Sequence, residues 1–199
     1  MPLSVTGKNN LISVTSFTHA SAWQDLGVTE STGGSYARQT ISWAAAASGA
    51  RANSAQITIP IAAGQTIQAV GIHDALSAGN SQGFFQIGSA LRGSASVTTA
   101  DTFTSLAHGL STDDRVFFTT IAGETIPTGI SITTLYFIRA TGATADTFTV
   151  STTSGGSALD ITAAGECAWF RTIPQTFAIA GNLILPTSTG IVIDATAFG

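Results

Sequence analysis

Residues 32–60 read TGGSYARQTISWAAAASGARANSAQITIP and decide the fold class. Two glycines open the stretch, the β-favouring QTIS follows, and ITI precedes a proline near its end. Ile57, Ile59 and Ile61 share one face of an expected strand because strand side chains alternate. Pro60 has no N–H to donate, so we expect this strand to end there or to lie at a sheet edge. Nothing in the stretch resembles a nucleophile, a metal cage or a phosphate loop.

The alanine-rich segment 43–48 could form a helix on propensity alone. The QTIS before it and Gly49 after it favour a strand with small residues instead. Along the rest of the chain, short runs of β-branched and aromatic residues alternate with Gly, Ser, Asn and Asp, and helical periodicity is nearly absent. The sequence therefore predicts an all-β protein.

The composition excludes several classes of protein. Only 9% of the 199 residues are charged, against roughly 25% in an average soluble domain, so we expect part of the surface to be hidden in an assembly. The net charge is −4, Lys8 is the single lysine and the arginines are scattered, which argues against nucleic-acid binding. No apolar run approaches the roughly 18 residues of a membrane span, and the N-terminal stretch does not resemble a signal peptide. These features, together with a lone cysteine, Cys167, that cannot form an intrachain disulfide, fit synthesis in a reducing cytoplasm.

The charge is distributed unevenly along the chain. The segment 93–169 holds two arginines and seven acidic residues, whereas the flanks hold five cations and four acids. We therefore expect a base domain of residues 1–92 and 170–199, with a small acidic β domain of residues 93–169 inserted as an exposed lobe. The base is expected to be a β-sandwich or jelly-roll-like fold.

Candidate catalytic and metal-binding residues are few. His108, Asp113 and Asp114 could ligate a metal, but Gly109 and the polar residues after it favour a loop between two strands. No spacing typical of a zinc or calcium site is present, so no metal or other cofactor is expected.

His73 beside Asp74 is the pair that most resembles part of a hydrolase site. Neighbours on a strand point to opposite faces, so Asp74 could not easily orient the imidazole, and we interpret the pair as a strand end followed by a turn. A glycosidase site, which needs two carboxylates, is harder to exclude. The acids lie mostly in apparent turns, however, so glycan cleavage is kept as a minor alternative to a non-enzymatic role.

The aromatic residues allow two interpretations. Three tryptophans and two phenylalanine pairs could form a sugar-binding platform: Trp23, Trp43, Trp169, Phe84–Phe85 and Phe117–Phe118. In each adjacent pair one ring should face the core and the other outward. An outward ring such as that of Phe85 is favoured as a contact with another protein. The lone Cys167 is expected to be a small buried side chain.

The flanks resemble a known family. The segments ESTGGSYARQ (30–39), TIQAVGIHDALSAGN (66–80) and TIPQTFAIAGNLIL (172–185) are similar in order and spacing to small structural proteins of tailed bacteriophages, usually labelled tail-fibre proteins. The N-terminal part up to about Gly27 fits that pattern least well. Residues 102–162 resemble a small β module that recurs in phage virion proteins, with HGL, RV, TLYFI, TFTVS and a Gly-Gly turn.

The resemblance implies a structural protein of the virion, with other capsid or tail proteins as partners and with a homo-oligomeric state. Three roles stay open: a capsid decoration or cement protein, a tail-fibre component whose lobe contacts a host-surface glycan or protein, and a glycan depolymerase.

Candidate interface residues come from the turn and from the C-terminus. Gly33 and Gly34 permit positive φ, and Tyr36 and Arg38 lie on one side of an extended segment, so ring and guanidinium could stack or reach a backbone carbonyl. Such a unit would fix a strand or a subunit contact. Phe198 would be an awkward apolar side chain on a free tail, so we expect it to pack on a neighbour.

Overall fold

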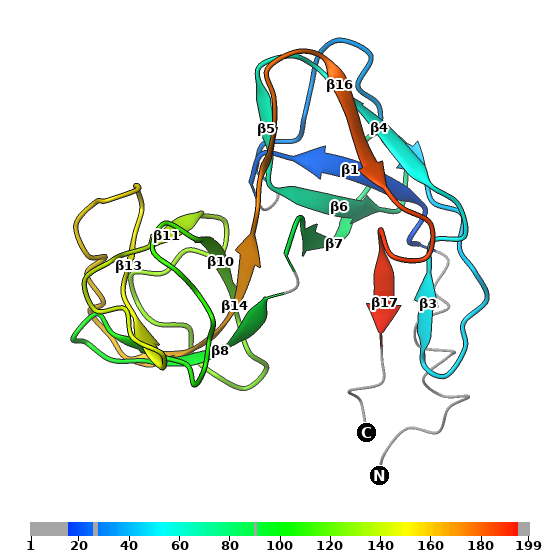
Figure 1. Ribbon diagram of the computed structural model, residues 1–199. Helices are drawn as coiled ribbons and strands as arrows, with labels where there is room; N and C mark the ends of the chain where they lie inside the picture. Colours follow the sequence, from blue (N-terminus) through cyan, green and yellow to red (C-terminus); the bar gives the residue numbers. More distant parts are fainter. Residues whose placement is uncertain (1–15, 26–27, 90, 195–199) are drawn as a thin grey trace. The chain divides into compact units, whose positions relative to one another are not determined.

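The computed structural model describes residues 16–25, 28–89 and 91–194. These residues form strands, turns and irregular segments, and no helix occurs among them (Figure 1). The predicted all-β class is confirmed. In the described part of the chain, no helix is long and apolar enough to cross a membrane.

The chain divides into two compact units, which are described separately. Unit 1 consists of Met1–Trp23, Glu30–Phe85 and Thr176–Gly199, and unit 2 of Gln24–Thr29 and Gln86–Gln175. The expected roles of a docking base and an exposed lobe stay predictions.

Unit 1 contains a four-stranded antiparallel sheet, in the order β2-β1-β6-β7, and three two-stranded ribbons, β15–β5, β16–β4 and β17–β3 (Figure 1). The strands of the sheet are β1 (His19–Trp23), β2 (Gln39–Thr40), β6 (Ala69–His73) and β7 (Ser81–Gln86). The strands of the ribbons are β3 (Ala50–Ala52), β4 (Ile57–Ile61), β5 (Gln65–Ile67), β15 (Gln175–Phe177), β16 (Gly181–Leu185) and β17 (Val192–Asp194).

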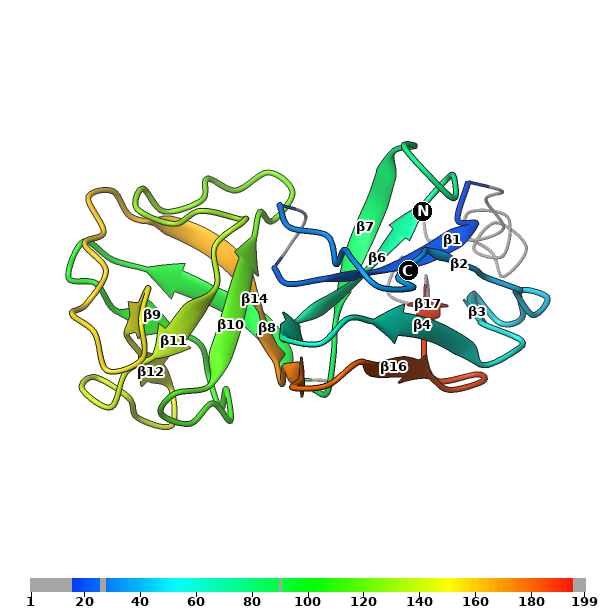
Figure 2. The ribbon, with the colours of Figure 1, turned by 90° about the horizontal axis from the view of Figure 1, so that it is seen from above.

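The β4–β16 ribbon shows why the sequence pattern produces this structure. Ile57, Ile59 and Ile61 are all buried, as the period-2 rule predicts, and Leu185 and Leu183 of β16 pair with Ile57 and Ile59. Figure 2 shows β4 and β16 side by side. β4 continues through Pro60 and pairs with β16 alone, so the proline lies in an edge strand.

The segment 43–48 is not a helix. Isolated bridges join Trp43 to Asn53 and Ala47 to Ala50, and the backbone N–H groups of Ala47 and Ala50 each donate to the other's carbonyl at 2.9 Å. Ser48 and Gly49 between them have φ of 51° and 83°, as a two-residue hairpin turn of type I′ requires. The alanines therefore form a narrow hairpin.

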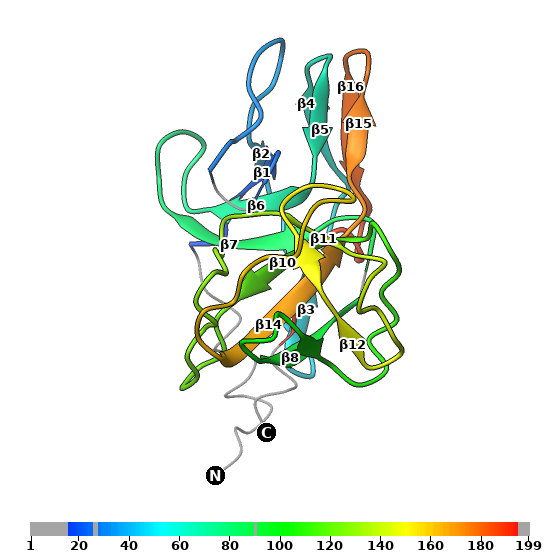
Figure 3. The same cartoon turned by 90° about the vertical axis from the view of Figure 1, so that its left-hand side faces the viewer.

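Unit 2 is a closed sheet. Its strands are β8 (Arg92–Val97), β9 (Phe103–Thr104), β10 (Arg115–Thr119), β11 (Tyr136–Ile138), β12 (Thr147–Phe148), β13 (Val150–Ser151) and β14 (Gly165–Thr172), in the order β12-β9-β8-β14-β10-β11-β13 (Figure 3). The two outermost strands, β12 and β13, are separated in sequence by Thr149 alone. One stretch of chain therefore pairs with β9 on one side and β11 on the other, which closes the sheet into a small barrel.

The barrel is filled by aromatic rings. Phe103 stacks on Phe118 and on Phe148, each with ring centroids 5.1 Å apart, and Phe148 meets Trp169 edge to face at 6.3 Å. Trp169 lies opposite Gly93 on β8, where a Cβ atom would come within 2.8 Å of the indole, so the glycine leaves the space that the ring fills. These contacts give unit 2 a dense apolar core.

Candidate functional site

The segment 30–38 forms a charged clasp of three side chains, Glu30, Tyr36 and Arg38. Arg38 donates to both carboxylate oxygens of Glu30, from Nε at 2.9 Å and from Nη2 at 2.7 Å, and Tyr36 donates its hydroxyl to Glu30 Oε1 at 2.7 Å. Arg38 Nη1 donates to the carbonyls of Ala75 and Ala78, at 3.2 and 2.7 Å. The clasp therefore ties the start of the segment to the loop after β6.

The electrostatics of the clasp keep it charged. Burial alone would raise the pKa of the Glu30 carboxyl, but the hydrogen bonds from Arg38 and Tyr36 outweigh it and lower that pKa. The hydrogen bond to Glu30 raises the pKa of Arg38, and burial together with the same carboxylate raises the pKa of Tyr36. A bidentate guanidinium–carboxylate pair of this kind fixes geometry as well as charge.

Two expectations for this segment are confirmed. Gly33 and Gly34 have φ of 82° and 59°, and Arg38 reaches backbone carbonyls. Glu30 was not anticipated as the acid that joins Tyr36 and Arg38, although it lies six and eight residues before them. The interface role of Tyr36 and Arg38 stays a prediction.

A second polar cluster fills the centre of the β1–β6 pair. Trp23 Nε1 donates to Ser21 Oγ at 2.6 Å, and His73 Nε2 lies 2.9 Å from the same oxygen. Ser21 and His73 are 0% and 2% exposed, so this Ser–His pair is closed to substrate. Asp74 accepts instead from the backbone and side chain of Asn80, which fits the interpretation of a strand end followed by a turn.

His73 is held neutral by its surroundings. Burial, followed by the charge of Arg38, lowers the pKa of the imidazole. Its Nδ1 is buried without a hydrogen-bond partner among the described residues, so a proton there would be unsatisfied. The histidine is therefore part of the core of unit 1.

Asn53 organises the C-terminal part of unit 1. It is 0% exposed; its side-chain amide donates to the carbonyls of Ala55 and Pro186, and its Oδ1 accepts from the backbone N–H of Ile191. The backbone carbonyl of Asn53 accepts from Ser188. Sequence reasoning missed this role, because two of the side-chain partners, Pro186 and Ile191, lie more than 130 residues away along the chain.

The expected alternation of the phenylalanine pairs is only partly right. Phe118 belongs to the barrel core, but Phe117 on the other face of β10 is also 0% exposed, so the prediction of an outward ring is wrong there. The reason is that both faces of β10 are covered. Phe84 and Phe85 are both half-buried, and Phe84 packs edge to face on Trp23.

The tryptophans do not form a sugar platform. Trp23 and Trp169 are buried, and the guanidinium of Arg51 lies 4.4 Å from the ring centroid of half-buried Trp43. Cys167 is 0% exposed, as predicted, and burial raises the pKa of its thiol to about 12. The interface role of Phe85 stays a prediction, and Phe198 lies outside the described residues.

His108, Asp113 and Asp114 do not converge on one point. His108 Nδ1 accepts from Leu110 N at 2.9 Å, so its Nε2 is the donor toward the carbonyl of Thr147. Asp114 pairs with Arg171 at 2.9 Å. Within the described ranges, no group of three His, Cys, Asp or Glu side chains could hold a metal ion. The loop interpretation therefore fits these residues better than a metal site.

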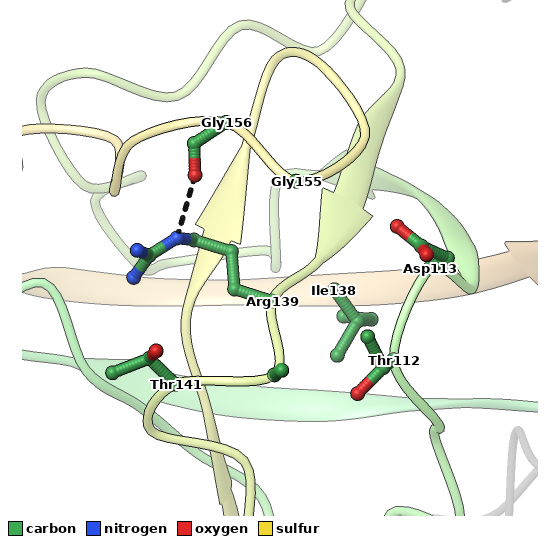
Figure 4. Close-up of a pocket in the computed structure, with 8 residues that line it drawn as sticks. Thr112, Asp113, Ile138, Arg139, Thr141, Gly155 and Gly156 are labelled. Atoms are coloured by element: carbon green, nitrogen blue, oxygen red, sulfur yellow. Dashed lines mark hydrogen bonds between the residues drawn. The ribbon is translucent and has the colours of Figure 1, made fainter.

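The acidic turn contributes instead to a small pocket of about 140 Å³ in unit 2 (Figure 4). The pocket is lined by Thr112, Asp113, Ile138, Arg139, Ala140, Thr141, Gly155 and Gly156. Arg139 Nε donates to the carbonyl of Gly156 at 3.0 Å, and Nη1 lies 3.3 Å from Thr149 Oγ1. Asp113, on the opposite side in Figure 4, accepts from Ser154 Oγ at 2.7 Å. The sequence drew attention to Asp113 but gave no signal for Arg139.

A larger hollow of about 510 Å³ lies beside β8, β14 and the segment 104–108. Arg92, Ser94 and Ser96 alternate along β8 with the buried Ala95 and Val97 and supply its polar floor. The buried Ser105 and His108 also line the hollow, but both accept hydrogen bonds within the protein, Ser105 from Trp169 Nε1 and His108 from Leu110 N. The Arg139 pocket, with a guanidinium that has further N–H groups, is therefore the better candidate site.

The chain was compared with known proteins. The family described as "Podophage GP4 fiber I protein gp80" matches residues 12–113, just over half of the chain, and this range contains strands β1 to β9. No curated protein and no solved structure matches the chain.

Proposed function

Because the chain belongs to the podophage GP4 fiber I protein gp80 family, we propose that it is a non-enzymatic structural component of a tailed-phage fibre, carried on the virion and docked there through unit 1. The observation that carries this proposal is the family match, which covers every strand of the four-stranded sheet of unit 1. The Ser21–His73 pair is buried and inaccessible to a substrate, which fits a role without catalysis.

Exposed apolar side chains supply the docking contact in this proposal. Ile179 is 80% exposed beside β16, and Ile184 and Val192, on β16 and β17, are each more than 40% exposed. Apolar side chains of this kind gain most from burial against a partner. The partner is another virion protein, and a second copy of the chain is proposed to join it in a homo-oligomer.

The position on the virion is tested by labelling. An epitope tag placed in the turn at Gly123, where φ is 86° and an added Cβ meets no atom within 4 Å, should leave the barrel intact. Gold-labelled antibody on intact particles is expected at the fibres. Label spread over the heads would make the protein a capsid decoration instead, and unlabelled particles would remove it from the virion.

The docking surface is tested by placing a charged side chain on it. Ile179→Asp is expected to reduce incorporation into particles at least about tenfold, because a carboxylate would have to be buried at the contact. Leu106→Asp is the matched control, since Leu106 in unit 2 is 81% exposed. Equal incorporation of both variants would contradict docking through this surface. A deletion of residues 195–199, measured by light scattering, separately tests the contribution of Phe198 to the oligomer.

A further inference from the structure

The pocket around Arg139 contains a positioned cation that forms no ion pair with the acid in the same lining, Asp113. Two of its nitrogens are fixed by Gly156 and Thr149, which leaves further N–H groups of the guanidinium available. None of the ion pairs of the described residues involves Arg139. An arginine held in one orientation loses little conformational freedom on binding, and its planar fork matches a carboxylate.

The rest of the pocket accepts and donates hydrogen bonds. Asp113 lies across from Arg139, with one carboxylate oxygen held by Ser154, and it adopts φ of 65°. Thr141 lies on the same side as the guanidinium, and its hydroxyl forms no hydrogen bond within the described part of the chain (Figure 4). The pocket thus presents a cation on one side and a carboxylate acceptor on the other, with the apolar side chain of Ile138 between them (Figure 4).

We propose that this pocket binds one acidic sugar unit, with its carboxylate on Arg139 and its hydroxyl groups on Asp113 and Thr141. A volume of about 140 Å³ is below the roughly 300 Å³ of pockets for drug-sized ligands, so a single ring is the appropriate size. An acidic peptide is less suitable, because an Asp or Glu side chain offers no hydroxyl groups for Asp113 and Thr141, whereas a sugar ring offers several. The inference rests on the proposed function in one respect, namely that a fibre presents unit 2 to glycans.

The binding test uses the purified full chain labelled with nitrogen-15. D-glucuronate is titrated while the amide resonances of Thr141, Gly155 and Gly156 are followed, and glucose and acetate serve as the neutral sugar and the simple carboxylate. Glucuronate is expected to give saturable shifts at these amides and to bind at least about tenfold more tightly than either comparison ligand, the effect of one charge-assisted contact.

The variants have matched controls. Arg139→Gln should weaken glucuronate binding about tenfold or more, whereas Arg92→Gln removes the same charge from an exposed position of unit 2 and should not. If Arg139→Gln fails to fold, Gly155→Asn replaces it. Asparagine tolerates the φ of 67°, its Cβ meets no atom within 4 Å, and its side chain should obstruct the pocket. Gly123→Asn is the corresponding control.

Each remaining outcome overturns the inference. Absence of saturable shifts, equal binding of glucose or acetate, tighter binding of a synthetic Asp/Glu-rich peptide, or equal losses in Arg139→Gln and Arg92→Gln would each exclude an acidic-sugar site at Arg139. The result is independent of the labelling experiment. A protein absent from virions can still bind glucuronate, and a fibre component can fail to bind it.

Discussion

The two units of this chain are stabilised in different ways. Unit 2 closes its sheet on itself and fills it with stacked rings, so few backbone groups are left at strand edges. Unit 1 buries aliphatic side chains, such as Ile59, Ile67 and Ile72, and it also contains polar clusters around Glu30, Ser21 and Asn53. The comparison indicates that both units are stabilised by apolar burial, that stacked aromatic rings supply much of it in the barrel, and that buried polar clusters add to it in unit 1.

The largest effect is expected in the barrel core. Phe103→Ala should lower the free energy of unfolding of unit 2 by about 3–5 kcal/mol, because the ring is fully buried between Phe118 and Phe148. Hydrogen exchange followed by mass spectrometry reports each unit separately, and protection should fall in 92–172 but not in 57–73. Leu106→Ala, at an exposed position, is the control. Equal loss of protection in both units would show that they unfold together.

The next effect tests the charged clasp of unit 1. Glu30→Gln should cost about 2–3 kcal/mol, because Arg38 keeps its charge at a mostly buried position without a carboxylate. Denaturant unfolding measures the loss. Asp160→Asn makes the same change of charge at an exposed residue and should stay within about 0.5 kcal/mol of wild type. A similar value for both variants would mean that the clasp contributes no more than a surface ion pair.

The local pattern of the sequence was sufficient for part of this comparison. Alternation placed Ile57, Ile59 and Ile61 on a buried face, and the missing N–H of Pro60 indicated an edge strand. The burial of Cys167 followed from the chemistry of a lone thiol. Each of these features depends on neighbours within a few residues or on the nature of one side chain.

Other features depend on contacts between distant parts of the chain. The closing of the barrel needs the stretch around Thr149 to pair on both sides, and no local pattern specifies two partners for one strand. The same applies to Asn53, whose partners lie in the C-terminal segment, and to Phe117, which lies on the face opposite the core and is nevertheless covered. The fixed orientation of Arg139 could not be predicted either, because it depends on the carbonyl of Gly156, which lies 17 residues further along the chain.

A smaller effect concerns pH. The pKa of His73 is lower in the folded protein than the usual 6.5, so the unfolded chain binds a proton first as the pH falls. Unit 1 should therefore lose stability as the pH decreases from about 6.5 to about 5, a window above the carboxyl titration of Glu30. His73→Gln should flatten this dependence in denaturant unfolding, and His19→Gln, which retains His73, should not. An unchanged slope in His73→Gln would assign the pH dependence to another group.

The smallest expected effect is an increase in the stability of unit 1 alone, caused by a substitution at Ser48. Ser48 occupies the first position of the type I′ turn with φ of 51°, where asparagine is favoured because its short polar side chain tolerates the left-handed region. Ser48→Asn is therefore expected to stabilise the hairpin by about 0.5 kcal/mol and to slow exchange of the Ala47 and Ala50 amides. Ser157→Asn, at an exposed position of unit 2, should leave both measurements unchanged. If Ser48→Asn has no effect while Phe103→Ala and Glu30→Gln behave as expected, the hairpin frays independently of the sheet and contributes little to the stability of unit 1.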